Sequence, residues 1–411
     1  MISRASLSAK LWTERAEGAA QHQCDAEMVS KIAAHKIDCV VGARPNFVKI
    51  APILRALRSR AGLSPRLIHT GQHYDATMNA VFFDELEIPD PDLNLEVGSG
   101  TGTEQTARIM LKLEPVLASR KPDLVVVVGD VNSTMAAALV AAKLNIPIAH
   151  VEAGLRSFDR AMPEEINRLV TDRLAQRLYL TERSAMKNLV KEGVDEEAIK
   201  FVGNVMIDTV YACLPRAVPA RATLLDYLSR SHAAKEAIEH GFAYVTLHRP
   251  SNVDDPERLR SLIGTLVQIS QKICLVWPVH PRTAAMIESV GLERRLGEGR
   301  IVSTAPLGYL RALGLMREAK FAITDSGGVQ EETTALGVPC LTVRENTERP
   351  VTVEQGTNLV VGTSAAALVA AVDDILATGG KAGRVPALWD GKAAERIVED
   401  ICEFLGMKSV G

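Results

Sequence analysis

The strongest constraint on the fold is a regular alternation, along the chain, of short Val-, Ile- and Leu-rich runs with longer amphipathic stretches. This alternation is typical of parallel sheets covered by helices. In the first half, the apolar runs are residues 37–41, 66–70, 124–128, 146–151 and 178–180. The helical patterns between them are residues 49–61, 102–118, 133–144 and 164–175. The first half therefore predicts a doubly wound, Rossmann-like α/β domain.

The alternation restarts near residue 243, which predicts a second domain of the same class facing the first across a cleft. Its apolar runs are residues 243–247, 273–276, 301–303, 322–324, 340–343 and 358–360. A chain of 411 residues is long enough for two such domains. The seam falls near residues 203–209, ahead of a helical stretch at 210–240. We predict an N-terminal extension (1–35), a first domain (36–205) completed by a helix within 385–411, and a second domain (206–384).

Charge and composition exclude several classes of partner. Forty-seven Lys and Arg against fifty Asp and Glu give a net charge of -3, which offers no general positive field for nucleic acid. No apolar run approaches the roughly 18–20 residues that cross a bilayer, and Lys10 and Glu14 interrupt any secretory signal. Six widely spaced cysteines without a Cys-x-x-Cys pair favour buried thiols over disulfides. We expect a cytoplasmic protein without a nucleic-acid or membrane partner.

The first predicted strand leads into a candidate anion site. Residues 42–46 form a glycine-containing turn before a helix that carries Lys49, and Arg44 lies within the turn. Backbone N–H groups at a helix start attract anions, and the two basic side chains add full charges. An ordinary turn with solvated basic residues explains the same pattern, so both interpretations stay open here.

Three carboxylates lie on one rim of the first predicted sheet. Asp130 follows the strand at 124–128, where it either serves a site or caps the next helix. Glu152 follows an apolar strand and precedes a glycine turn, which favours a functional carboxylate over a solvated charge. Glu164 lies at a helix start, where the helix dipole alone can account for it. Carboxylates that converge in a cleft shift one another's pKa and can divide into acid and base roles.

The second half places different chemistry at its strand ends. His248 follows a predicted strand beside Arg249, where a ligand contact competes with a structural role. Residues 325–328 read Asp-Ser-Gly-Gly at a helix start, which suits a pyrophosphate because backbone donors can approach without a Cβ. Arg349 either reaches a sugar or phosphate or belongs to a charged surface loop. No motif of the chain predicts a metal site or a serine nucleophile.

Taken in chain order, the motifs resemble the non-hydrolysing UDP-N-acetylglucosamine 2-epimerases. The resemblance spans residues 36 to about 362. The matching segments are Gly42-Ala43-Arg44-Pro45, Thr70-Gly71-Gln72-His73, Gly129-Asp130, His150-Val151-Glu152-Ala153-Gly154-Leu155-Arg156, Pro163-Glu164-Glu165-Ile166-Asn167-Arg168, Gly203-Asn204, His248-Arg249, Asp325-Ser326-Gly327-Gly328-Val329-Gln330-Glu331-Glu332 and Thr347-Glu348-Arg349-Pro350.

The resemblance implies a fold like that of the two-domain (GT-B) nucleotide-sugar glycosyltransferases, usually in a homodimer, with the substrate closed between the domains. It implies C2 epimerisation of UDP-N-acetylglucosamine to UDP-N-acetylmannosamine through 2-acetamidoglucal. It also implies a role in supplying precursors for cell-envelope polysaccharide. It implies no metal or nicotinamide cofactor.

The family's residue roles carry over to matching positions of this chain. The resemblance implies an acid and base set of Asp130, Glu152, Glu164 and His248. It implies substrate-binding roles in the first domain for Arg44, Lys49 and Arg168. In the second domain it implies a diphosphate cradle at Ser326, Gly327 and Gly328, a ribose-holding carboxylate at Glu332, and a substrate-contacting Arg349. Changing one of the three acids to its amide is expected to reduce turnover with little loss of stability.

The chain departs from the family pattern at two places. Residues 72–75 read Gln-His-Tyr-Asp, where many bacterial members have Gln-His-Arg and are activated by a second substrate molecule. An aromatic near the uracil in some relatives falls on Ala312, which leaves Tyr309 as the nearby candidate. The alternatives are an epimerase for a modified sugar such as UDP-2,3-diacetamido-glucuronic acid, a hydrolysing epimerase, a glycosyltransferase and a non-catalytic UDP-sugar-binding protein.

Overall fold

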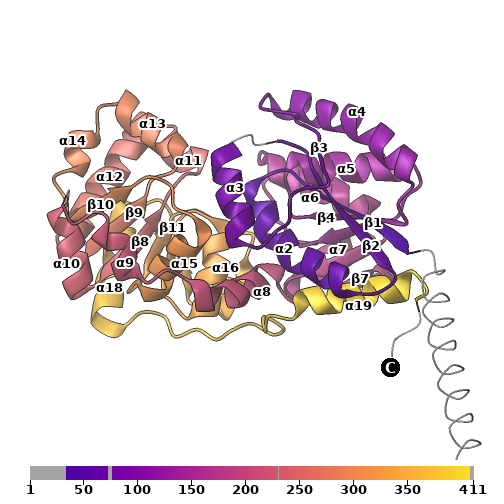
Figure 1. The fold of residues 1–411 in the computed structure, drawn as a ribbon. Coiled ribbons are helices and arrows are strands. Elements are labelled where there is room, and N and C mark those ends of the chain that lie inside the picture. Colours follow the sequence, from indigo (N-terminus) through magenta and orange to yellow (C-terminus); the bar gives the residue numbers. More distant parts are fainter. Residues whose placement is uncertain (1–33, 73–75, 230, 408–411) are drawn as a thin grey trace, which may run out of the picture.

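The computed structural model describes residues 34–72, 76–229 and 231–407, which form two α/β halves side by side (Figure 1). The seven-stranded sheet of the first half has the order β3-β2-β1-β4-β5-β6-β7. The six-stranded sheet of the second has the order β10-β9-β8-β11-β12-β13. Neighbouring strands in both sheets run parallel. The expected fold class is therefore confirmed. Residues 1–33 of the expected extension (1–35) lie outside the described residues, and His35 already belongs to β1.

The predicted strands occur in both sheets with small changes at their ends. The first sheet contains β1 (His35–Val41), β2 (Leu63–His69), β3 (Leu93–Asn94), β4 (Leu124–Val128), β5 (Ile148–Val151), β6 (Arg177–Leu180) and β7 (Ile199–Phe201). The second contains β8 (Phe242–Thr246), β9 (Cys274–Pro278), β10 (Ile301–Thr304), β11 (Ala322–Thr324), β12 (Cys340–Thr342) and β13 (Asn358–Val360). Sequence analysis missed β3 and β7, because two or three residues at a sheet edge give too short an apolar run.

Helices cover both faces of each sheet. Those of the first half are α2 (Arg44–Ser59), α3 (Ala76–Glu85), α4 (Gly102–Arg120), α5 (Asn132–Lys143), α6 (Pro163–Leu174) and α7 (Ser184–Lys191). The predicted helical stretch at 210–240 is instead divided into α8 (Val205–Cys213), a 3-10 turn (Leu214–Arg216), α9 (Ala220–Leu225) and α10 (His232–His240). Pro215 and Pro219 account for the interruption between α8 and α9, because proline lacks the N–H that continues a helix.

The remaining helices belong mostly to the second half. They are α11 (Pro250–Val253), α12 (Pro256–Ser270), α13 (Pro281–Ser289), α14 (Glu293–Leu296), α15 (Tyr309–Glu318), α16 (Gly327–Leu336), α17 (Pro350–Glu354), α18 (Ala365–Thr378) and α19 (Ala393–Phe404). None of the helices in the described residues is long and apolar enough to cross a membrane.

Strand β4 shows why central strands are apolar throughout. All five of its residues are buried, because helices cover the sheet on both sides. Val126 and Val128 pack in the core layer that contains Phe47 of α2. Val125 and Val127 point the opposite way, into the layer that contains α4 and α5.

The last helix, α19, packs on α2 and α8, and Figure 1 shows it beneath the first sheet. Ile397 and Ile401 of α19 are fully buried in the core of the first half. The hydroxyl of Tyr179 on β6 donates to Asp400 Oδ2 at 2.8 Å. The final helix is therefore part of the hydrophobic core of the first half. The domain boundaries predicted at residues 36, 205 and 384 stay a prediction.

Candidate active site

The carboxylate of Glu152 lies buried between two cations. Glu152 directly follows β5, has a backbone φ of 72° and is 2% exposed. Its two oxygens contact Lys49 Nζ of α2 and Arg349 Nη2 of the second half. Burial by itself raises the pKa of Glu152, but the two cations outweigh that effect and lower its pKa. A left-handed backbone at a non-glycine residue costs about 1–3 kcal/mol, and such strain concentrates at functional sites.

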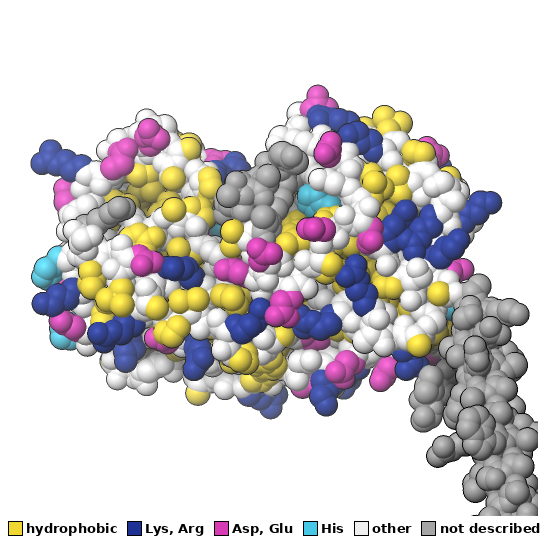
Figure 2. All heavy atoms as spheres, in the orientation of Figure 1, with side chains coloured by type: hydrophobic (Ala, Val, Ile, Leu, Met, Phe, Trp, Pro, Cys, Tyr) yellow, Lys and Arg dark blue, Asp and Glu magenta, His cyan; other side chains and the backbone are white. Residues whose placement is uncertain are grey.

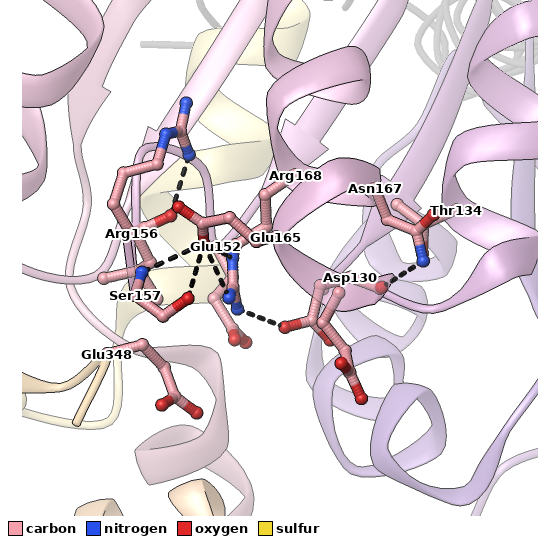
Figure 3. Close-up of polar contacts among 12 residues, drawn as sticks. Asp130, Thr134, Glu152, Arg156, Ser157, Glu165, Asn167, Arg168 and Glu348 are labelled. Atoms are coloured by element: carbon pink, nitrogen blue, oxygen red, sulfur yellow. Dashed lines mark hydrogen bonds and ion pairs between the residues drawn. The ribbon is translucent and has the colours of Figure 1, made fainter. Parts of the chain in front are cut away.

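Asp130 lies at the carboxyl end of β4, where Arg168 holds its side chain. Arg168 Nη1 donates to Asp130 Oδ2 at 2.6 Å, and Asn167 Nδ2 donates to the Asp130 backbone oxygen at 2.8 Å (Figure 3). The N-cap of α5 is Val131, and the side-chain bond that the start of α5 makes, from Ser133 N–H, goes to Gln72 Oε1 and not to Asp130. The alternative in which Asp130 caps this helix is therefore wrong. Arg168 is itself 2% exposed, so its guanidinium is committed to its acidic partners.

Two neighbouring glutamates at the start of α6 have different surroundings. The Glu164 side chain is 38% exposed and lies 3.8 Å from Arg249 Nη1 of the second half. Glu165 is buried, pairs with Arg168 at 2.9 Å and accepts backbone N–H groups from Ser157 and Phe158 (Figure 3). Glu165 therefore shapes the loop, whereas Glu164 is partly exposed and faces Arg249 of the second half.

In the second half, Asp325 organises the turn that carries His248. Asp325 follows β11, is fully buried and accepts the backbone N–H of His248 at 3.0 Å and of Arg249 at 2.9 Å. His248 Nδ1 lies 3.4 Å from Asp325 Oδ1, and its ring stacks on His280. Burial lowers the pKa of His248, although Asp325 opposes the shift. Sequence analysis did not select Asp325, but an acid directly after an apolar strand was the available signal.

The proposed diphosphate cradle begins α16. Ser326 is the N-cap of this helix and makes no side-chain capping bond, and the turn continues through Gly327 and Gly328. A Cβ on Gly327 would lie 2.9 Å from Glu348 Oε1. Glu348 is buried among arginines, and despite burial they hold its pKa well below its usual range. The turn thus offers an anion-binding helix start, with its glycine required by close packing.

Two adjacent acids on α16 have pKa values that are shifted in the direction opposite to that of Glu348. Burial raises the pKa of Glu331 and of Glu332 to about 7 each. Tyr309, itself buried, donates its hydroxyl to Glu332 Oε1 at 2.9 Å. Glu331 Oε1 lies 3.0 Å from Arg349 Nε and accepts from Asn204 Nδ2 at 2.9 Å. Sequence analysis missed Glu331, whose partners are distant in the sequence.

Two contacts join candidate residues of the first half to the second half. Acids of the first half meet arginines of the second in the pairs Glu152–Arg349 and Glu164–Arg249. His248 is next to Arg249 in the chain and joins the group through it. The outline of the molecule dips between the two lobes (Figure 2).

Some predicted positions remain outside this description. Arg44 begins α2, and its side chain lies outside what the structure describes, as do residues 73–75 of the departing segment. The preceding Gln72 accepts from Ser133 Oγ at 2.7 Å. In the described part of the chain, no group of three or more His, Cys, Asp or Glu residues could hold a metal ion.

Comparison with known proteins gives one consistent result. The family model described as UDP-N-acetylglucosamine 2-epimerase matches residues 55–402. The UDP-N-acetylglucosamine 2-epimerase of Methanocaldococcus jannaschii is 41% identical over 88% of this chain and 98% of its own. The crystal structure of the M. jannaschii enzyme with UDP-GlcNAc and UDP has a TM-score of 0.78 and 40% identity, over 90% of this chain and 99% of that one.

A relative named for a different substrate has the same percentage identity over a shorter match. The UDP-2,3-diacetamido-2,3-dideoxy-D-glucuronate 2-epimerase of Pseudomonas aeruginosa is 41% identical over 80% of this chain and 88% of its own. The fold and the site define a nucleotide-sugar enzyme with two Rossmann-like halves. The chain belongs to the UDP-N-acetylglucosamine 2-epimerase family.

Proposed function

We propose that this protein interconverts UDP-N-acetylglucosamine and UDP-N-acetylmannosamine by inverting C2. The observation that carries the proposal is the pairing of first-half acids with second-half arginines, Glu152 with Arg349 and Glu164 with Arg249. A UDP-sugar between the halves would meet carboxylates at its sugar and the turn at residues 326–328 at its diphosphate. Membership of the family, and UDP-GlcNAc and UDP bound to the M. jannaschii relative, support this substrate class.

The chemistry needs acids and bases on both faces of C2. A base takes the C2 proton, the C–H electron pair forms the C1=C2 bond of 2-acetamidoglucal, and the C1–O bond breaks with its electrons leaving on UDP. In the return step a proton is delivered to C2 on the opposite face, and a phosphate oxygen of UDP adds to C1. Atoms and electrons balance without water or a redox partner. We assign the proton transfers to the set Asp130, Glu152, Glu164 and His248.

Other residues stabilise the charges that develop. C1–O cleavage places negative charge on the diphosphate, which the helix start at Ser326 is arranged to receive. We assign the ribose hydroxyls to Glu332, beside Tyr309. Lys49, Arg168 and Arg349 would act on the substrate through the acids that they pair with, because each is buried in an ion pair.

A second candidate substrate is UDP-2,3-diacetamido-glucuronic acid. The P. aeruginosa epimerase for this sugar has the same 41% identity to the chain as the M. jannaschii enzyme, over 80% of the chain against 88%. Parallel assays of the purified protein with both UDP-sugars, compared by kcat/KM, decide between them.

The decisive experiment follows hydrogen exchange at C2. The protein is incubated with UDP-N-acetylglucosamine in deuterium oxide, and the H1 and H2 proton signals are recorded. We expect deuterium at C2 and a mixture of two intact UDP-sugars without added cofactor. Free UDP with free sugar would show hydrolysis instead. An absence of exchange with both UDP-sugars would refute epimerisation and favour glycosyl transfer or binding alone.

We also propose that the protein is a homodimer that buries the outer face of α4. Ala107, Leu111, Pro115 and Ala118 are exposed at helical spacing on this face, and Leu111 is 72% exposed. The opposite face of α4 packs in the core. An apolar helix face of this kind suits a second copy of the chain. The cytoplasmic location expected from the sequence stays a prediction.

A further inference from the structure

His150 lies between the two turns that carry Asp130 and Glu152, although no role has yet been given to it. It belongs to β5, two residues before Glu152, and its side chain is fully buried. Its Nε2 lies 2.8 Å from the backbone oxygen of Gly129, the residue before Asp130. Its Nδ1 lies 2.6 Å from Asp172 Oδ1 on α6. The ring therefore joins the end of β4 to α6 directly beside the candidate catalytic carboxylates.

Asp172 extends the same contact to the other side of Glu152. Its second oxygen accepts the backbone N–H of Gly154 at 3.0 Å and lies 2.7 Å from Arg156 Nη2. His150 and Gly154 are each two residues from Glu152, so Asp172 fixes the chain on both sides of that turn. Arg156 Nη2 also forms an ion pair with Glu192 at the end of α7. The Glu152 turn is thus held by Asp172 of α6 and, through Arg156, by Glu192 at the end of α7.

The partners of the ring determine its protonation. A backbone carbonyl can only accept a hydrogen bond, and an ionised carboxylate can only accept as well. The second oxygen of Asp172 accepts the Gly154 N–H and lies beside the Arg156 guanidinium, and both contacts favour an ionised carboxylate. Both ring nitrogens must then carry protons to satisfy their partners. With His150 as an imidazolium, the charges of buried His150, Asp172 and Arg156 and of the partly exposed Glu192 side chain are balanced.

We propose that His150 is a positioning residue, held as an imidazolium by Asp172, that fixes the Gly129–Asp130 turn and, through Asp172, the Glu152 turn. The inference rests on the proposed function for its kinetic consequence only. Both turns have left-handed backbone, with φ of 67° at Gly129 and 72° at Glu152. Glycine adopts this conformation without strain, but at Glu152 it persists because surrounding contacts over-determine it, which the contacts of His150 and Asp172 help to do.

A spectroscopic test reads the protonation without the reaction. The full chain is labelled with 15N-histidine, and the His150 signals are assigned by their loss in His150→Gln. We expect two protonated ring nitrogens for His150 at pH 7.5. His69 provides a contrast in the same sample, because burial lowers its pKa and it should keep one bare nitrogen. A bare ring nitrogen on His150 would overturn the proposal.

Kinetics separate positioning from a general structural role. In His150→Gln we expect kcat to fall by about 10- to 100-fold, because small displacements of reacting groups are costly. UDP affinity by calorimetry should stay within about threefold, because the diphosphate cradle is in the other half. Wild-type kcat, or a loss of UDP affinity as large as that of kcat, would contradict the assignment. If His150→Gln fails to fold, Asp172→Asn replaces it, and the His150 ring should then show one bare nitrogen.

The two proposals can fail separately. A wild-type protein that exchanges no hydrogen at C2 of either UDP-sugar would remove the epimerase function, and the nitrogen spectrum would still decide the charge of His150. An active wild type with a neutral His150 would remove only the positioning role.

Discussion

At the scale of single residues, carboxyl groups that are similarly buried have pKa values shifted in opposite directions. Glu152 and Glu348 are buried beside cations, and their pKa values are lowered. For Glu331 and Glu332 burial dominates, and it raises the pKa of each to about 7. The difference lies in the number of arginine and lysine groups within reach, and therefore in tertiary contacts.

The structure changes the expectation for amide variants of the acids. In Glu152→Gln two buried cations lose their counter-charge, so unfolding free energy should fall by about 3–5 kcal/mol together with turnover. Glu164→Gln should reduce turnover by at least about 100-fold with unchanged stability, because this side chain is 38% exposed. Urea unfolding and kcat of the two variants provide the comparison. Equal stability loss in both would contradict the burial argument.

Glu332 makes stability depend on pH. Its pKa of about 7 in the folded protein exceeds the ordinary 4.5, so the unfolded chain releases this proton first as pH rises. Stability from this group is present below pH 4.5 and lost by pH 7. Glu332→Gln should therefore gain up to about 3 kcal/mol over wild type at pH 8, and little at pH 4.5.

The control for Glu332 is an acid with the opposite shift. Glu348 has a lowered pKa, so its stabilisation is present above its ordinary pKa and lost only in acid. Glu348→Gln should therefore lose stability at both pH 6 and pH 8. Denaturation midpoints of both variants at these pH values provide the measurement. A Glu332→Gln variant whose difference from wild type is the same at every pH would refute the assignment.

Phe158 carries strain beside the site. It has a φ of 58°, is 76% exposed, and its backbone N–H is held by Glu165. Phe158→Gly should raise the unfolding free energy by about 1 kcal/mol and lower kcat/KM, because strain that persists is typically functional. Lys121→Gly, at a φ of 51° after α4, should give a similar gain with unchanged kcat/KM. Full activity in both variants would show that the Phe158 strain has no catalytic role.

At the scale of elements, α19 shows how a terminal helix supports a distant sheet. Ile397 is fully buried against the core that contains α2. Ile397→Ala should cost about 2–5 kcal/mol of unfolding free energy by leaving a cavity. Glu399→Ala, exposed on the same helix, should change it by less than about 0.5 kcal/mol. Urea unfolding measures both, and a similar small effect for Ile397 would mean that α19 is not part of the core.

At the scale of the whole molecule, the proposed dimer depends on α4. Leu111→Glu places a charge on the exposed apolar face and should convert a dimer into a monomer of 44.4 kDa. Leu376→Glu makes the same change on α18, where Leu376 is 44% exposed, and should leave the dimer intact. Light scattering after size-exclusion chromatography measures the mass. A dimeric Leu111→Glu protein would exclude this face as the interface.

The sequence determined the layers of this protein and the location of most of its chemistry. Apolar periodicity predicted the central strands, and Asp130, Glu152, His248 and the glycine turn were placed at strand ends because those patterns are local. The family motifs lie in these same segments. Strands β3 and β7 and the division of the 210–240 stretch were not predicted, since short edge strands and proline breaks leave little periodic signal.

Tertiary structure alone decided which charges meet. Arg349 contacts Glu152 across 197 residues of sequence, and Asp172 joins His150 to the Gly154 backbone. These contacts lower the pKa of Glu152, and burial raises that of Glu331. No local pattern contains this information, because a buried charge is governed by the groups that folding brings within a few ångströms of it.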